Sequence, residues 1–145
     1  WRLLATLTFD QTSCLMSANP GDSTVPYDIS AERGWVRVAD VVPAPGTIVE
    51  SFIDRKGQTD DLVVWTTASG VPCVSEARCP HQWSHLASEG AVDGEELVCV
   101  SHFWRFGVEG EGWKQNVNGR RDRKGDLEVL PCVEYDGGVW VQSAD

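Results

Sequence analysis

Several features that would place this protein in a large functional class are missing from its 145 residues. No apolar run is long enough to cross a bilayer, so we expect no membrane partner. Positive charge is scarce, since 12 Lys and Arg stand against 22 Asp and Glu, and the net charge is -10. This balance argues against nucleic acid and favours a partner with a basic face. No phosphate-binding loop, nucleophile or proton-transfer pair is evident, so we expect no catalytic residue.

Histidine and cysteine are also few, and their distribution is uneven. Two of the three His and two of the five Cys lie in two short segments, Cys79-Pro80-His81 and Cys99-Val100-Ser101-His102. Thiolate and imidazole together form metal-ligand sets, because thiolate selects zinc or iron–sulfur and imidazole suits zinc, copper or iron. A metal-free alternative, with core Cys and surface His, is disfavoured because each Cys has its His at ligand spacing. These four residues are therefore the candidate metal ligands.

The remaining cysteines are Cys14, Cys73 and Cys132. Cys73 and Cys132 lie in apolar stretches, where a buried free thiol is more common than a disulfide. Free thiols persist in a reducing compartment, so we expect a cytoplasmic protein.

Short apolar strands separated by turn residues dominate the chain from Trp35 onward. We expect strands within residues 34–38, 46–53, 62–67, 71–74, 91–99, 103–108, 126–135 and 139–141. Their spacing of about 8–12 residues is typical of an all-β sandwich or barrel. Lys56 to Asp61 is expected to be a polar turn and residues 84–87 a short helical turn, while Asp136-Gly137 is the strongest hairpin signal.

The first 34 residues differ from the rest. Residues 17–30 are rich in Ser, Pro, Gly, Asn and Asp, a composition typical of a loop or frayed tail. Met16-Ser17-Ala18 reads like a natural start, so we hypothesise that residues 1–15 do not belong to the mature protein. We expect a tail over residues 1–34 and one domain over residues 35–145.

Cys-x-His followed by Cys-x-x-His resembles the ligand pattern of Rieske [2Fe–2S] proteins, in which two His replace two Cys on one iron. The resemblance extends over residues 35–142. It implies an all-β Rieske-type fold of antiparallel sheets, with a small cluster-binding subdomain on a sandwich or barrel base. The cluster loops would be residues 79–85 and 99–104. The resemblance further implies the roles of the ligands: Cys79 and Cys99 bind the buried iron, and His81 and His102 bind the iron nearer the surface.

Zinc is an alternative to the cluster, since two Cys and two His also form a structural zinc set. The usual first pair of such a set is Cys-x₂₋₄-Cys, whereas this chain has Cys79-x-His81. A zinc-stabilised interaction module therefore stays open as a third hypothesis.

Residues beside the ligands depart from the family in several ways. Trp83 and Phe103 replace glycines that many relatives have, and Ser84 and Ser101 stand where high-potential members have a disulfide. Trp104 stands where those members have a Ser that donates to a cluster sulfur. With that donor and the disulfide missing, we predict a reduction potential in the lower part of the Rieske range of roughly −150 to +300 mV.

Three side chains near the ligands leave their roles open. Trp83 and Trp104 either pack against apolar neighbours or form a lid that keeps water off the sulfurs. His85 is expected to be a loop residue within hydrogen-bond reach of the cluster, rather than a ligand.

Residues 113–125 are expected to hold a third loop, which in relatives covers the cluster, and residues 116–125 are expected to be a polar loop. This segment carries a basic island in an acidic protein: Arg120, Arg121, Arg123 and Lys124, beside Asp122. The island is either a solvated turn or a docking patch for an acidic partner.

The function that the resemblance implies is one-electron transfer. The first hypothesis is a monomeric Rieske-type ferredoxin, not itself an enzyme, between a flavin-dependent reductase and a terminal oxygenase. Only His85 is left once the ligands are assigned, so no His/His/carboxylate set for a mononuclear iron is expected. The second hypothesis is a non-catalytic subunit or domain of a larger oxidoreductase, similar to the small subunit of nitrite reductase.

Overall fold

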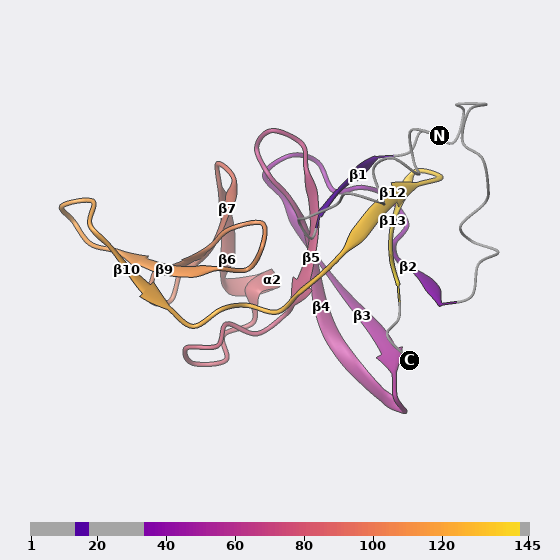
Figure 1. Ribbon diagram of the computed structural model, residues 1–145, viewed down its shortest axis with the longest axis horizontal. Coiled ribbons are helices and arrows are strands. Elements are labelled where there is room, and N and C mark those ends of the chain that lie inside the picture. The colour runs from indigo at the N-terminus through magenta and orange to yellow at the C-terminus, as the bar shows by residue number, and fades with distance from the viewer. Residues whose placement is uncertain (1–13, 18–33, 143–145) are drawn as a thin grey trace.

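The structure, a computed structural model, describes residues 14–17 and 34–142, which form three sheets and one short helix (Figure 1). The first sheet has the strand order β1-β12-β13-β2, the second β11-β5-β4-β3, and the third β10-β9-β8-β7-β6. The elements are β1 (Cys14–Ser17), β2 (Trp35–Ala39), β3 (Ile48–Arg55), β4 (Gln58–Thr66), β5 (Pro72–Glu76), α2 (Leu86–Glu89), β6 (Gly90–Asp93), β7 (Glu96–Cys99), β8 (Trp104–Phe106), β9 (Gly112–Gln115), β10 (Arg121–Lys124), β11 (Val129–Leu130), β12 (Cys132–Tyr135) and β13 (Gly138–Gln142). All strand pairs except β1 with β12 are antiparallel, which confirms the all-β prediction.

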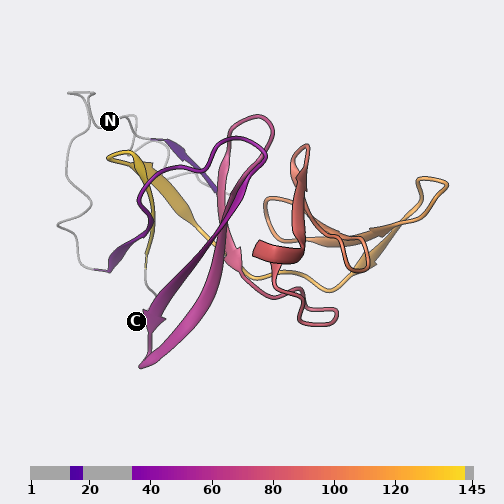
Figure 2. The same ribbon diagram turned by 180° about the vertical axis from the view of Figure 1, so that it is seen from behind.

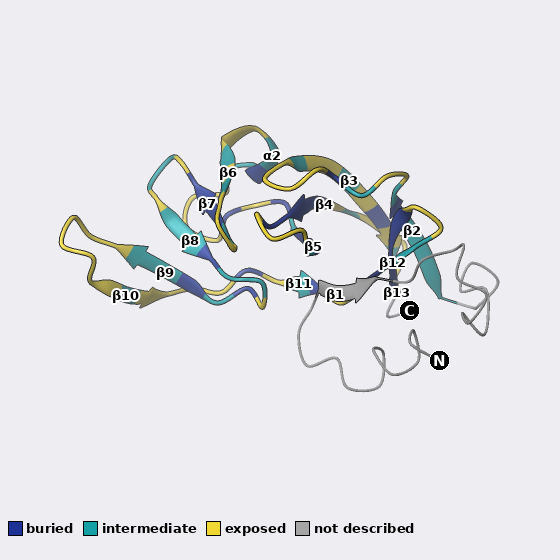
Figure 3. Ribbon diagram, turned by 90° about the horizontal axis from the view of Figure 1, so that it is seen from above, coloured by how far each residue is buried: buried dark blue, intermediate teal, exposed yellow. Residues whose placement is uncertain are grey.

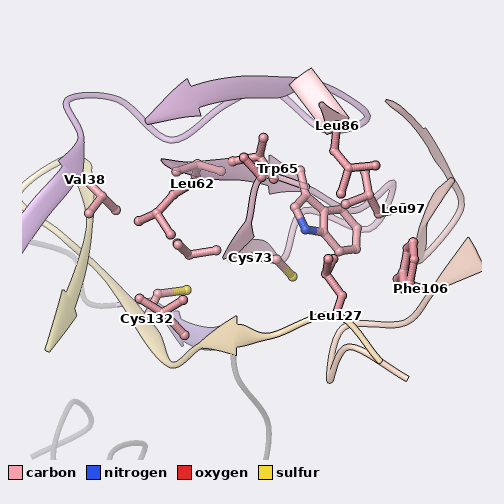
Figure 4. Packing of buried hydrophobic residues seen from close by; sticks show 14 of the residues in the cluster. Val38, Leu62, Trp65, Cys73, Leu86, Leu97, Phe106, Leu127 and Cys132 are labelled. Carbon is pink, nitrogen blue, oxygen red and sulfur yellow. The ribbon is translucent and has the colours of Figure 1, made fainter. Parts of the chain in front are cut away.

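The two four-stranded sheets form the base of the molecule and share a buried apolar core. Val38 of β2, Leu62 of β4 and Cys132 of β12 come from different strands and belong to one cluster (Figure 4). β4 supplies an unbroken buried run from Leu62 to Thr66, which explains its apolar, β-branched sequence. Cys73 and Cys132 are buried free thiols, as predicted, while the side chain of Cys14 lies outside the described residues.

The five-stranded sheet extends away from this base (Figures 1 and 2). Leu97 and Phe106 from its inner strands are fully buried and join the same cluster as Trp65 of the base (Figure 4). Its outer strands β9 and β10 carry mostly exposed and half-buried residues (Figure 3). The sheet is thus anchored at one edge and solvated at the other.

Two hairpin turns explain why the base strands pair as they do. Lys56-Gly57 between β3 and β4 has φ values of 54° and 74°, and Asp136-Gly137 between β12 and β13 has 52° and 76°. Positive φ at both central residues is the type I′ requirement that matches strand twist. The Asp136-Gly137 hairpin prediction is confirmed.

Three predicted segments differ from the structure. Strand β4 begins at Gln58, so the polar turn is only Lys56-Gly57 and not residues 56–61. Thr59 is exposed and Asp60 is half-buried and paired with Arg55, so both polar residues are stable in the strand. Residues 112–115 and 121–124 form the paired strands β9 and β10, although residues 113–125 were expected to be a loop. Residues 14–17 form β1, parallel to β12, inside the segment expected to be a tail.

Within the described ranges, no helix has the length and apolar character that a membrane span requires.

Candidate metal centre

The two predicted ligand loops meet at the junction of the five-stranded sheet and the base. Cys79 follows β5 and Cys99 ends β7, and both are about 1% exposed and belong to the common core cluster. Their thiols are close enough to interact electrostatically and by a hydrogen bond. The sulfur pair is therefore fixed inside the protein.

The two imidazoles lie on the outer side of the thiols. His81 is exposed and His102 half-buried, and their ring centroids are 4.7 Å apart in an edge-to-face arrangement. Trp104 stacks on His81 with a centroid distance of 4.5 Å and an interplanar angle of 15°. The prediction that sulfur points inward and imidazole outward agrees with this burial.

Both loops form the same backbone turn. The Trp83 N–H donates to the Cys79 carbonyl at 2.9 Å, and the Phe103 N–H donates to the Cys99 carbonyl at 2.7 Å. Trp83 and Phe103 have φ values of 63° and 62°, a left-handed conformation that is strained for bulky residues. In both loops an aromatic residue therefore adopts a backbone conformation that glycine would adopt without strain.

The electrostatics of Cys79 favour a bound cation. Burial, together with the neighbouring Cys99 thiol, raises the pKa of Cys79 to about 11. The backbone N–H groups of His81 and Gln82 donate to its sulfur and favour the thiolate. Two adjacent buried thiolates require a positive partner, because unpaired charges in a protein interior are costly. The pocket therefore fits a metal group that binds two thiolates.

His81 is suited to be a neutral ligand. Desolvation lowers the pKa of His81, and the charges of His102, Lys114 and Lys124 lower it further. The unprotonated imidazole is the form that binds a metal. Lys114 also donates from Nζ to the His102 carbonyl oxygen at 2.6 Å and so holds the second loop in place.

The four candidate ligands form two pairs, Cys79 with Cys99 and His81 with His102. A structural zinc ion would bind all four side chains, whereas a binuclear cluster takes its Cys on one iron and its His on the other.

Comparison with known families distinguishes the binuclear cluster from the zinc ion. The model of the Rieske [2Fe-2S] domain matches residues 35–132, which include all four candidate ligands. The chain belongs to the Rieske family. Membership implies a Rieske-type [2Fe–2S] cluster, and the buried thiols and surface imidazoles fit that group.

Relatives of this Rieske chain are oxygenases and desaturases by name. Cholesterol 7-desaturase nvd of Bombyx mori is 31% identical over 109 residues, which cover 75% of this chain and 23% of the relative. The oxygenase component of 3-ketosteroid-9-alpha-monooxygenase of Rhodococcus rhodochrous is 40% identical over 50 residues, 34% of this chain and 13% of the relative. This Rieske chain thus spans less than a quarter of these two relatives.

Solved structures support the fold. Dicamba monooxygenase superposes with a TM-score of 0.60 at 22% identity, covering 77% of this chain and 34% of the monooxygenase. At this level of identity the similarity concerns the fold alone.

Two serines link the cluster loops of this Rieske domain. Ser84 Oγ donates to Ser101 Oγ at 3.2 Å, and Ser101 Oγ donates to Glu89 Oε1 at 2.8 Å. These are the positions expected to correspond to the disulfide of high-potential members. A chain of hydrogen bonds therefore joins the loops, and it extends to helix α2.

His85 has a structural position instead of a ligand position. Its Nδ1 accepts from the Ala87 N–H at 3.1 Å and caps α2, while its Nε2 lies 3.9 Å from Glu50 Oε1. His85 also lines an open hollow of about 590 Å³ together with Glu50, Ser51, Phe52, Thr59 and Asp61. The expected helical turn at residues 84–87 corresponds to this capped helix.

The aromatic side chains divide into two kinds. Trp104 stacks on His81, a position from which its ring can shield the candidate ligand from water. Trp83 is 68% exposed and Phe103 is 60% exposed, so neither packs in the core.

The basic island lies on the β9–β10 hairpin and its turn, and its arginines are paired. Arg121 binds both carboxylate oxygens of Glu96, at 2.6 and 2.8 Å. Arg120 pairs with Asp122, and Arg123 pairs with Asp126. Much of the island's charge is therefore compensated within the chain.

Sequence reasoning missed three residues that organise the site. Glu89 accepts from Ser101, Lys114 holds the His102 carbonyl, and Glu96 joins Arg121 to Arg105. Lys114 lies opposite Trp104 on the neighbouring strand. This position could have been predicted only if the pairing of β8 with β9 had been known.

Proposed function

We propose that this chain is the electron-transfer domain of an oxygenase component, which accepts single electrons from a flavin-dependent reductase and passes them to the catalytic centre. The observation that carries the proposal is the arrangement of the ligands: Cys79 and Cys99 are buried, while His81 is exposed beside His102. A carrier needs its redox group held rigidly on one side and accessible on the other. The relatives are named oxygenases and desaturases and are several times longer, which favours this role over a nitrite-reductase-like small subunit.

The cluster supplies one-electron chemistry when bound, at potentials set by its His ligands and their surroundings. Cys79 and Cys99 would hold the inner iron in the common core. His81 and His102 would hold the outer iron and present their ring edges to the surface. Trp104 covers one face of His81 and excludes water there, and Lys114 fixes the backbone of His102.

Oxygen chemistry itself would need residues beyond these. The 145 residues contain three His, and two of them are proposed ligands. The third, His85, caps α2 and faces Glu50. Any substrate oxidation would therefore take place on another part of the same polypeptide or on another subunit.

A free Rieske-type ferredoxin is the second candidate, because the ligand set and a domain of this size are sufficient for a carrier. The mass of the protein isolated from its native source distinguishes the two. A mass several times the 15.9 kDa of this chain supports a domain of an oxygenase component. A mass near this value, with elution as a separate small protein, supports the ferredoxin.

The proposal as a whole is tested by reduction with a purified flavin-dependent ferredoxin reductase and NADH, followed by absorbance. Uptake of one electron per chain is expected, with reoxidation when an oxygenase catalytic component is added. A chain that binds iron but takes up no electron would contradict both candidates.

A further inference from the structure

The second ligand loop is held by two residues of opposite charge. The Glu89 backbone carbonyl accepts from the Val100 N–H at 2.8 Å, and Glu89 Oε1 accepts from Ser101 Oγ at 2.8 Å. Lys114 Nζ donates to the His102 carbonyl oxygen at 2.6 Å. Three consecutive residues, the last of them a proposed iron ligand, are therefore tied to one acidic and one basic residue.

The two charged residues belong to strands on either side of this loop. The loop connects β7 to β8, and the sheet order β10-β9-β8-β7-β6 places β6 and β9 on the two flanks of that pair. Glu89 directly precedes β6, and Lys114 lies in β9. A negative and a positive charge therefore reach the same loop from opposite flanks.

Holding the loop does not by itself require charge. Ser84 Oγ bonds to the same Ser101 hydroxyl at 3.2 Å as a neutral group. Lys114 is half-buried, where an ammonium group loses hydration and a long side chain loses rotamer freedom. The two charges are therefore expected to have an effect that neutral hydrogen bonds lack.

A fixed charge beside a redox group changes its reduction potential. Reduction by one electron adds one negative charge, which a nearby cation stabilises and a nearby anion destabilises. The Lys114 charge acts on the ligand region: desolvation is the largest cause that lowers the pKa of His81, and the charges of His102, Lys114 and Lys124 lower it further. Glu89 is exposed, so water and salt screen its charge more strongly.

We propose that Glu89 and Lys114 are positioning residues that hold the second ligand loop and shift the midpoint potential in opposite directions, Lys114 raising it and Glu89 lowering it. This inference rests on the proposed one-electron function and names residues that set its potential. The effect of Lys114 is expected to be the larger, because its charge is half-buried.

The test is a redox titration of the iron-loaded protein at low ionic strength, followed by absorbance. Lys114→Met keeps an unbranched side chain without the charge, and Glu89→Gln keeps an acceptor for Ser101 without the charge. At the wild-type midpoint, Lys114→Met should lower the ratio of reduced to oxidised protein about threefold, which corresponds to a midpoint about 28 mV lower. Glu89→Gln should raise this ratio about 1.5-fold at low salt and leave it unchanged in about 1 M salt.

Matched controls lie in the hairpin turns of the base. Lys56→Gln, between β3 and β4, and Asp136→Asn, between β12 and β13, each remove one charge outside the ligand loops. Neither should change the midpoint. Lys114→Arg, which keeps the charge and a donor, should stay closer to the wild-type midpoint than Lys114→Met.

Iron release to a chelator measures the positioning role separately from the charge. Lys114→Met should release iron faster than wild type, because it loses the bond to the His102 carbonyl. Lys124→Gln removes another charge that acts on His81 but keeps that bond. It should lower the midpoint and leave the release rate unchanged.

Opposite shifts of the midpoint in Lys114→Met and Glu89→Gln are the expected result. Shifts in the same direction, or no shift, overturn the inference, because loosening of the loop would have the same sign in both variants. Equal release rates of Lys114→Met and Lys124→Gln overturn the positioning role. If Lys114→Met binds no iron, Glu89→Gln and Lys124→Gln decide, and midpoints displaced in the same direction overturn the inference. A wild-type protein that binds iron but accepts no electron contradicts the proposed function, and this inference with it.

Discussion

The base and the five-stranded sheet are stabilised in different ways. In the base, the strands carry apolar residues such as Ile53, Leu62 and Trp65 that are at most 1% exposed. The five-stranded sheet buries Leu97 and Phe106 on its interior strands β7 and β8, and ion pairs through Glu96 join β7 to β8 and to β10. The five-stranded sheet therefore combines a small apolar contact with ion pairs, whereas the base is stabilised mainly by its apolar core.

The largest expected effect is the loss of iron when a proposed metal ligand is replaced, compared with replacement of another buried cysteine. Cys99→Ser should abolish cluster binding, because serine replaces a thiolate on the buried iron, and amide exchange should then increase in β6–β10 more than in β3–β5. Cys132→Ala, at an equally buried cysteine of the base, should keep full iron content. Iron analysis and hydrogen-exchange mass spectrometry provide the measurements. Iron bound normally by the Ser variant would contradict the ligand assignment.

A second prediction concerns the core of the base. Leu62→Ala removes a side chain that is 1% exposed, and it should lower the free energy of unfolding by about 2–5 kcal/mol. Denaturant titration followed by tryptophan fluorescence measures this loss. Val117→Ala, at a fully exposed position in the turn between β9 and β10, should change the free energy by less than about 0.5 kcal/mol. Equal effects of the two changes would show that the base is not the stable region.

The ion pairs of the five-stranded sheet give a smaller, pH-dependent effect. Hydrogen bonds from Arg121 and Arg105 lower the pKa of Glu96 from about 4.5 to about 2. Glu96→Gln should therefore lower the free energy of unfolding by about 1–3 kcal/mol at pH 7.

The sign of the pH effect follows from the depressed pKa in the folded protein. The stabilisation is complete above pH 4.5 and is lost as the pH falls toward 2. Unfolding titrations of wild type and Glu96→Gln should therefore converge as the pH is lowered from 7, over the range in which both keep their iron. Glu109→Gln, at an exposed glutamate, is the control. If the difference in free energy of unfolding between wild type and Glu96→Gln stayed constant with pH, the ionised Glu96 carboxylate would not be its cause.

The smallest effect is expected at the serine link between the loops. Ser84→Ala removes the donor to Ser101 and should lower the free energy of unfolding by about 1 kcal/mol. Ser88→Ala serves for comparison, because it removes a hydroxyl on the nearby helix α2 that donates to the His85 carbonyl at 3.3 Å. Iron release from the Ser84 variant should be faster than from the Ser88 variant. Identical release rates would show that the link does not hold the loops together.

The sequence indicated the candidate ligands more clearly than it indicated the outer strands. The four candidate ligands stand out because thiolate and imidazole at short spacing have few alternative uses, and their assignment stays a prediction. The Asp136-Gly137 turn was recognisable because a type I′ turn needs residues that tolerate positive φ. The core strand containing Leu62 was visible as an apolar run.

Other elements gave no such pattern. Strand β10 has the sequence Arg-Asp-Arg-Lys, and its pairing depends partly on Glu96, 25 residues earlier in the chain. The packing role considered for Trp83 was wrong because an exposed aromatic at positive φ is uncommon and cannot be distinguished from a buried one by sequence. The low reduction potential stays a prediction, supported by the hydroxyl link at Ser84 in place of a disulfide.

The most direct test of the account is iron and inorganic sulfide analysis combined with electron paramagnetic resonance of the purified protein. We predict two irons and two sulfides per chain, with a signal that appears only after reduction by one electron. A single ion bound by Cys79, His81, Cys99 and His102 together, or a protein that binds no iron, would contradict the account.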